Sequence, residues 1–127
     1  MKPVHQTILH APRGNCFSAC LASLLEVGCD DVPNIHDFGD EWFYPLNKWL
    51  LETHRLVLLM ITASTYRSAL WLPDEVPFIA TCDVGGGWRH AVVMTYRGME
   101  AIVLHDPLPE GGANQSGPVY MYFLVKP

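Results

Sequence analysis

A cysteine opens the most helix-like stretch of this chain, "RGNCFSACLASLLEV", residues 13–27. Cys16 follows a Gly-Asn pair and begins an apolar run, and Cys20 lies one helical turn further on. A helix N-terminus carries about half a positive charge, and this charge favours a nucleophilic thiolate over a thiol. Free cysteines are also common core residues. Cys16 is therefore a candidate nucleophile only if a base and an orienting group exist elsewhere.

The histidine best placed to act as that base is His90. It follows the Gly-rich "DVGGGWR" and begins the strand-like "HAVVMTY", which "RGME" joins to "AIVLHD" in a hairpin pattern. A three-residue loop near Gly98 would keep even-numbered residues on one face, with Asp106 opposite His90 or one diagonal step away. An even-length loop would put His105 on that face instead. If the loop has three residues, the hairpin predicts a His90–Asp106 pair.

Two helices are expected in the first half of the chain. The first runs from about Cys16 to Val27, with Gly28 as its stop and Asn15 as a side-chain N-cap. The second lies in "EWFYPLNKWLLETH" and starts near Tyr44, because a proline fits only the first turn of a helix. The aromatic residues of this region are expected in the core: Trp42, Phe43 and Trp49.

Five strands are expected after the helices. They are "RLVLLMIT", apolar enough for a central strand, "VPFIATCD", the two hairpin segments and "VYMYFLVK". Residues 62–75 look irregular or partly helical, and residues 107–117 form a polar, Gly-rich loop. Helices followed by a mostly antiparallel sheet predict an α+β fold in a single domain, residues 1–127.

Composition excludes several classes of function. The 127 residues are 50% apolar and 17% charged, with a net charge of −5 and no basic cluster, which argues against nucleic acid or an anionic membrane as partner. Without a signal-peptide pattern or a run of roughly 20 apolar residues, we expect a cytoplasmic protein with reduced cysteines. The four cysteines contain no C-x-x-C pair. A metal site built from Cys16, Cys20 and His90 would lack the recurring sequence spacing of known metal ligands, so no metal or cofactor is expected.

A family resemblance becomes visible at these residues. "GNCFSACLASLLEV", followed downstream by "HAVVMTY" and "AIVLHDP", resembles the papain-like cysteine peptidases, nearest to the bacterial bacteriocin-processing peptidases that cut after a double-glycine leader. The resemblance implies a papain-like fold, with a Cys-bearing helix packed on the sheet. It also implies Cys16 as nucleophile, His90 as base and Asp106 as orienting residue, in a hydrolase that acts on a peptide or protein.

The sequence departs from this family at two points. A bulky Phe17 follows the nucleophile where the family has glycine. The family also places an oxyanion-hole glutamine a few residues before the cysteine, and the only upstream glutamine, Gln6, is further away. A loop through "ILHAPRG" could still bring Gln6 into the oxyanion hole, or Asn15 or the Cys16 amide could serve instead. Gly87 and Trp88 are the candidate residues of the substrate cleft.

Two other classes of function remain open from the sequence. The chain could be a catalytically inactive papain-like module that binds or inhibits a protein partner. It could also be a thiol-redox protein in which Cys16 and Cys20 cycle. The bond cleaved, the choice between hydrolase and transferase, and the oligomeric state have no readable signal in the sequence.

Overall fold

The computed structural model describes residues 1–9, 14–63, 75–85, 88–109 and 118–127. Helices come first and strands afterwards, so the predicted α+β class is confirmed. The helical part consists of α1 (Cys16–Leu25), the 3-10 helices η1 (Cys29–Asp31) and η2 (Ile35–Phe38), and α2 (Phe43–His54). The strands are β1 (Val57–Thr62), β2 (Phe78–Gly85), β3 (Trp88–Arg97), β4 (Glu100–His105) and β5 (Pro118–Val125).

The five strands form one antiparallel sheet in the order β1-β5-β2-β3-β4. The expectation that the apolar segment 55–62 forms a central strand is wrong, because β1 pairs only with β5 and lies at the sheet edge. Leu59 and Met60 are consequently 50% and 48% exposed. The last strand of the chain, β5, takes the more central position between β1 and β2.

Helix α1 begins at Cys16 as expected, but both of its ends differ in detail from the prediction. Asn15 occupies the N-cap position without a side-chain capping bond, because its Oδ1 accepts hydrogen bonds from the Thr7 and Ile8 N–H groups instead. Glu26 rather than Gly28 ends the helix, with φ 60° and its backbone N–H donated to the Ala22 carbonyl. The rest of the helix is tightly packed, and every residue from Phe17 to Ser23 is buried.

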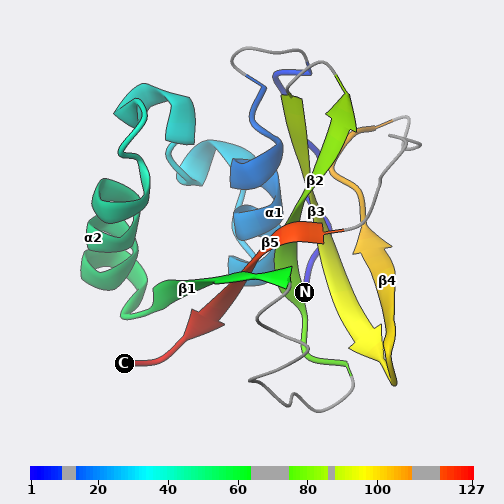
Figure 1. Ribbon diagram of the computed structural model, residues 1–127. Helices are drawn as coiled ribbons and strands as arrows, with labels where there is room; N and C mark the ends of the chain where they lie inside the picture. Colours follow the sequence, from blue (N-terminus) through cyan, green and yellow to red (C-terminus); the bar gives the residue numbers. More distant parts are fainter. Residues whose placement is uncertain (10–13, 64–74, 86–87, 110–117) are drawn as a thin grey trace.

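Helix α2 starts at Phe43, so Pro45 lies in its first turn as predicted. Asn47 fastens this helix to β1, since its Oδ1 accepts a hydrogen bond from the Leu58 N–H at 2.7 Å and its Nδ2 donates to the Leu58 carbonyl at 3.2 Å. Figure 1 shows α2 and the 3-10 helices on one side of α1 and the strands β2, β3 and β4 on the other. Neither described helix is long and apolar enough to cross a membrane.

The sheet buries apolar side chains on both faces. One cluster joins the sheet to α1 and α2 through Leu21, Leu46, Leu50, Ile79, Val93 and Tyr122. The other cluster lies on the opposite face and contains Phe78, Cys82, Val92, Met94, Met121 and Phe123. Alternating residues of β2 and β3 thus go to different clusters, as the period-two geometry of a strand requires. Helix α1 is thereby packed against one face of the sheet.

The β3–β4 hairpin contains an extra residue. Arg97 pairs with Glu100, which leaves a two-residue turn at Gly98 and Met99 in place of the expected three-residue loop. Gly98 has φ 62°, a conformation that glycine adopts without strain. Further along, Met94 pairs with Val103 but Val93 pairs with His105, so Leu104 is a β-bulge. The structure describes only the ends of the segments 62–75 and 107–117, which were expected to be irregular.

Candidate active site

Cys16 differs from the other three cysteines in its surroundings. It is half-buried at the first position of α1 and lines a surface pocket, whereas Cys20, Cys29 and Cys82 are buried. Burial raises the pKa of Cys20 well above its ordinary value, and it raises the pKa of Cys82 to about 11. Desolvation therefore keeps those two sulfurs as neutral thiols. All four cysteines are free.

His90 and Asp106 meet directly. The His90 Nε2 lies 2.7 Å from the Asp106 Oδ1, and both side chains are nearly buried. The same Asp106 oxygen accepts a hydrogen bond from the Leu108 N–H at 3.0 Å, which fixes the orientation of the carboxylate. With Nε2 directed at Asp106, the other ring nitrogen, Nδ1, is left for a second partner.

Cys16 lies near enough to His90 to act on the charge of the imidazole. Burial of the imidazole opposes its positive charge, but interactions with the Cys16 sulfur and with the Asp106 carboxylate outweigh that effect. Together they raise the pKa of His90 from 6.5 to about 8. The structure thus brings Cys16, His90 and Asp106 near one another, in an arrangement that favours the protonated imidazole.

The hairpin brings His90 and Asp106 together by a route that differs from the predicted one. A two-residue turn on its own would have put His105 on the face of His90, as the sequence argument stated for even-length loops. The bulge at Leu104 shifts the register by one residue, so Asp106 in place of His105 lies on the face of His90. Continuing the Val93–His105 register sets Asp106 opposite Val92, one diagonal step from His90. His105 instead contacts the Val4 carbonyl through Nε2 at 2.7 Å.

Gln6 lies next to this group despite its distance in sequence. Its backbone N–H donates to the Pro107 carbonyl at 2.8 Å, directly after Asp106. Its side chain is buried, and Nε2 donates to the Ile8 carbonyl at 2.9 Å, an oxygen that also accepts the Asn15 N–H. The Gln6 Oε1 has no hydrogen-bond partner among the described residues. Nε2 carries two hydrogens and makes one bond, so within the described ranges its second hydrogen has no partner.

Asn15 has a different role from the one considered for it. Its Oδ1 accepts hydrogen bonds from the Thr7 and Ile8 N–H groups, each at 2.9 Å. Its Nδ2 donates to Thr7 Oγ1 at 2.8 Å and to Cys29 Sγ at 3.3 Å. Both amide hydrogens are used, so the Asn15 side chain has none to give to an oxyanion. Asn15 instead fastens the segment that contains Gln6 to the residue before Cys16.

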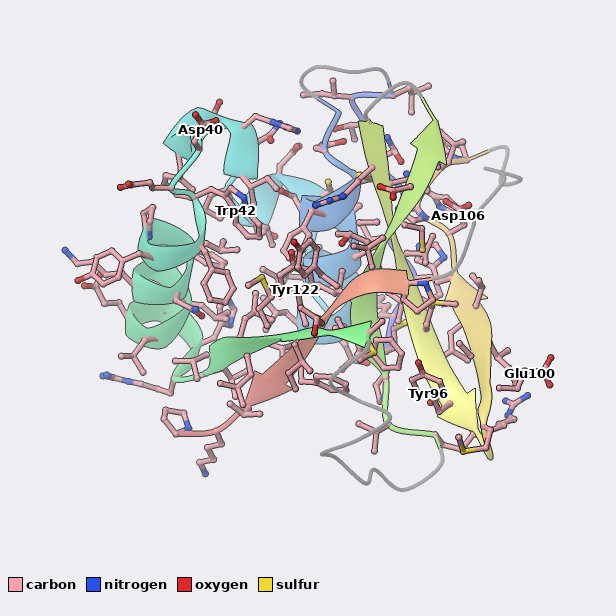
Figure 2. The ribbon with its side chains drawn as sticks, in the orientation of Figure 1. Asp40, Trp42, Tyr96, Glu100, Asp106 and Tyr122 are labelled. Carbon is pink, nitrogen blue, oxygen red and sulfur yellow. The ribbon has the colours of Figure 1, made fainter. Side chains whose placement is uncertain are left out.

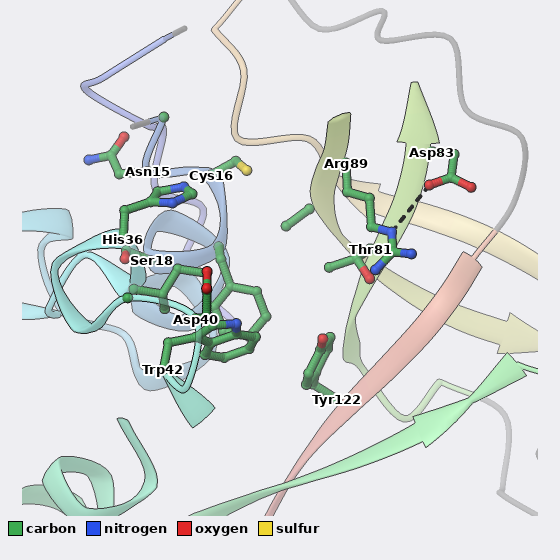
Figure 3. Close-up of a pocket in the computed structure, with 15 residues that line it drawn as sticks. Asn15, Cys16, Ser18, His36, Asp40, Trp42, Thr81, Asp83, Arg89 and Tyr122 are labelled. Atoms are coloured by element: carbon green, nitrogen blue, oxygen red, sulfur yellow. Dashed lines mark hydrogen bonds and ion pairs between the residues drawn. The ribbon is translucent and has the colours of Figure 1, made fainter. Parts of the chain in front are cut away.

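The pocket beside Cys16 has a volume of about 720 Å³. Figure 3 shows its two walls, one from the start of α1 and the residues around η2, the other from β2, β3 and β5. Most of the residues that line the pocket were not predicted, because they come from segments far apart in the sequence. They include His36, Asp40, Thr81, Asp83, Arg89 and Tyr122. Trp42 was expected in the core in preference to a ligand-binding surface; it packs against the core and Phe17, and it also lines the pocket.

The remaining predicted site residues are placed as follows. Trp88 is the first residue of β3, but its side chain lies outside the described structure, as does Gly87 altogether. Phe43 and Trp49 pack against the core cluster, as predicted. In the described ranges of the chain, no group of three or more histidine, cysteine or acidic residues is arranged to hold a metal ion.

Comparison with known proteins adds no relative to this description. No protein-family model matches the sequence, and no curated protein and no solved structure matches it.

Proposed function

We propose that this chain is a papain-like cysteine hydrolase that cleaves an amide bond in a peptide or protein. The observation that carries the proposal is the position of His90, with its imidazole held by Asp106 at 2.7 Å and its pKa raised to about 8 by interactions that include the Cys16 sulfur. A cationic imidazole beside a cysteine at a helix N-terminus is the arrangement that favours a thiolate nucleophile.

The proposed reaction has two stages. In the first, the Cys16 Sγ attacks the carbonyl carbon of the substrate, and His90 transfers its proton to the leaving amine as the C–N bond breaks. In the second, His90 takes a proton from water, whose oxygen attacks the thioester carbon and releases the carboxylic acid and the Cys16 thiolate. Asp106 holds the imidazole orientation throughout. An amine or another acceptor in place of water would give a transferase.

Two hydrogen-bond donors are available for the negative oxygen of the tetrahedral intermediate. The Cys16 backbone N–H lies in the first turn of α1, where amide groups have no helical partner. The second is the uncommitted amide hydrogen of Gln6. Loss of one such donor typically lowers a rate by about 10²–10³. A Gln6→Ala variant therefore tests this assignment by its effect on kcat.

The nearest sequence likeness suggests the first substrates to test. If the chain shares the activity of the bacteriocin-processing peptidases it resembles, peptides with a double-glycine site are cleaved after the second glycine. The assay is mass spectrometry of a mixed peptide library, with Cys16→Ala as the matched control. Products that appear with the wild type and not with Cys16→Ala support the hydrolase. A wild type that cleaves no amide and whose Cys16 is no more reactive than Cys20 overturns it and favours a binding module.

A further inference from the structure

The two walls of the pocket beside Cys16 differ in how their charges are matched. On the sheet wall, Arg89 Nε contacts Asp83 Oδ1 at 3.2 Å. The guanidinium of Arg89 also lies over the Tyr120 ring, 4.9 Å from its centre. The positive charge of Arg89 is thus already matched within its own wall, and it offers little attraction for an anionic ligand.

The opposite wall carries an acidic group that is not matched in this way. Asp40 lies between η2 and α2 and lines the pocket close to Trp42 (Figure 3). It is exposed, and no hydrogen bond or ion pair engages it within the part of the chain that the structure describes. His36 is the other titratable residue on this wall. In Figure 2, Asp40 and Trp42 lie on the helical side of the molecule, and Asp106 lies on the side of β3 and β4.

Aromatic rings form the apolar lining between the walls. Phe17 contacts Trp42 and Tyr122 edge-to-face, with ring centres 5.1 Å and 5.0 Å apart. All three rings line the pocket; Phe17 and Tyr122 are buried, so Trp42 is the ring most open to a ligand. Such a surface accepts the methylene stem of a long side chain, and the faces of aromatic rings attract cations. The aromatic lining and the unmatched carboxylate therefore favour the same ligand, a side chain with a long apolar stem and a positive charge at its end.

We propose that this pocket binds the lysine or arginine side chain of a residue adjacent to the scissile amide, with Asp40 as the residue that determines this specificity. The proposal rests on the proposed function for its reference to a scissile bond. The stem of the substrate side chain lies against Trp42 and Tyr122, and its cationic head reaches the Asp40 carboxylate. A glutamate side chain in the same place meets uncompensated negative charge.

Binding can be tested without catalysis in the Cys16→Ala variant. Peptides that differ only in lysine, norleucine or glutamate at one position are titrated by calorimetry at pH 8. We expect the lysine peptide to bind about fivefold more tightly than the norleucine peptide, as for a partly exposed charge pair over an aromatic surface. Equal affinities, or no binding by either peptide, overturn the proposal.

Two variants in the Cys16→Ala background assign the effect to Asp40. Asp40→Asn should abolish the preference for lysine, because it removes the charge and keeps the shape. Glu41→Gln is the matched control, since Glu41 is an adjacent exposed acid that does not line the pocket. This control should retain the fivefold preference. A preference that survives Asp40→Asn overturns the role of Asp40.

Labelling of the wild type separates this inference from the proposed function. A peptidyl chloromethyl ketone forms a bond between its methylene carbon and the Cys16 sulfur, and chloride leaves. Fast labelling of Cys16 with no lysine preference in the binding experiment supports the hydrolase and overturns the proposal that the pocket binds a cationic side chain. A lysine preference that depends on Asp40, together with a Cys16 that labels no faster than Cys20, supports the pocket and overturns the hydrolase.

Discussion

The His90 Nε2 lies 2.7 Å from the Asp106 Oδ1 because the β3–β4 hairpin has one unpaired extra residue, Leu104, before Asp106. The two-residue turn at Gly98 and Met99 gives β3 and β4 a register that would turn Asp106 away from His90. Leu104 corrects that register as a bulge. The pairing of the two residues is therefore a property of the hairpin backbone as well as of the two side chains.

Deletion of Leu104 should separate His90 from Asp106. Without the extra residue the strand keeps the register of its turn, and the side chain at position 106 moves to the other face. We expect the pKa of His90, measured by NMR titration of its ring protons, to fall from about 8 towards its ordinary value of 6.5.

The control for this deletion is Leu104→Ala, which keeps the bulged residue and shortens only its exposed side chain. This variant should keep a His90 pKa of about 8. Both proteins need an unchanged far-ultraviolet circular dichroism spectrum. A folded deletion variant with an unshifted His90 would contradict the account of the bulge.

Replacement of His90 by alanine should slow the alkylation of Cys16. In the proposed mechanism the imidazole assists attack by the Cys16 sulfur, so its loss should lower the iodoacetamide rate at pH 7 by about tenfold. The measurement is peptide mass spectrometry of each cysteine after timed alkylation. Cys20 serves as an internal control, since burial within α1 should keep it slow in both proteins. An unchanged Cys16 rate would show that the imidazole does not act on the sulfur.

The raised pKa of His90 also predicts how stability depends on pH. Because the pKa is about 8 in the folded protein and 6.5 in an unfolded chain, the protonated form stabilises the fold. This contribution is complete below pH 6.5 and is lost as the pH rises through 8. Its size, from the difference between the two pKa values, is about 2 kcal/mol.

Urea unfolding of the wild type and of His90→Asn at pH 6 and pH 9 measures this contribution. The free energy of unfolding should fall by about 2 kcal/mol more in the wild type than in the variant. Taking the difference between the proteins removes the effect of the other titrating groups. A difference that stays constant over this pH range would contradict the raised pKa.

Asn15→Ala should destabilise the fold and also disturb the site. The substitution removes four hydrogen bonds, three of them to Thr7 and Ile8, at a cost of about 1–2 kcal/mol in the free energy of unfolding. Because Asn15 fastens the segment with Gln6 to the start of α1, the reactivity of Cys16 should change as well.

Asn47→Ala is the matched control for that prediction. It removes the two hydrogen bonds between α2 and Leu58, so it should also lower the free energy of unfolding. It lies away from the pocket, so the alkylation rate of Cys16 should be unchanged. Equal effects of the two variants on Cys16 would mean that Asn15 acts only through general stability.

The parts of the site that the sequence predicts are those with local signals. A cysteine at the start of an apolar helical run and a histidine at the start of a strand are both visible in short windows, and α1 and β3 lie where these patterns indicate. The His90–Asp106 pair was predicted from a loop length that is wrong, and Leu104 compensates for that error. Bulges have no reliable pattern in a single sequence, so this compensation could not be foreseen.

The parts that were missed depend on contacts between distant segments. Asn15 was predicted as a helix cap because its residue type suits that position, but tertiary bonds to Thr7 and Ile8 compete for its amide. The apolar strand β1 was expected at the centre of the sheet, yet β5 takes the place beside β2. Asp40 and Arg89 face one pocket only because η2 and β3 pack on opposite sides of it.

The bonds that join the first residues to the end of β4 have a consequence for synthesis of the chain. The Gln6 N–H is held by the Pro107 carbonyl, and the Val4 carbonyl meets His105, a contact between residues 101 positions apart. The sheet also needs β5, the last strand, between β1 and β2. A chain still emerging from a ribosome can form α1 with Cys16 at its start, but it has no Asp106, no anchor for Gln6 and no complete sheet. The proposed nucleophile is thus translated early and acquires its partners late, so a nascent chain carries the cysteine without the machinery to use it.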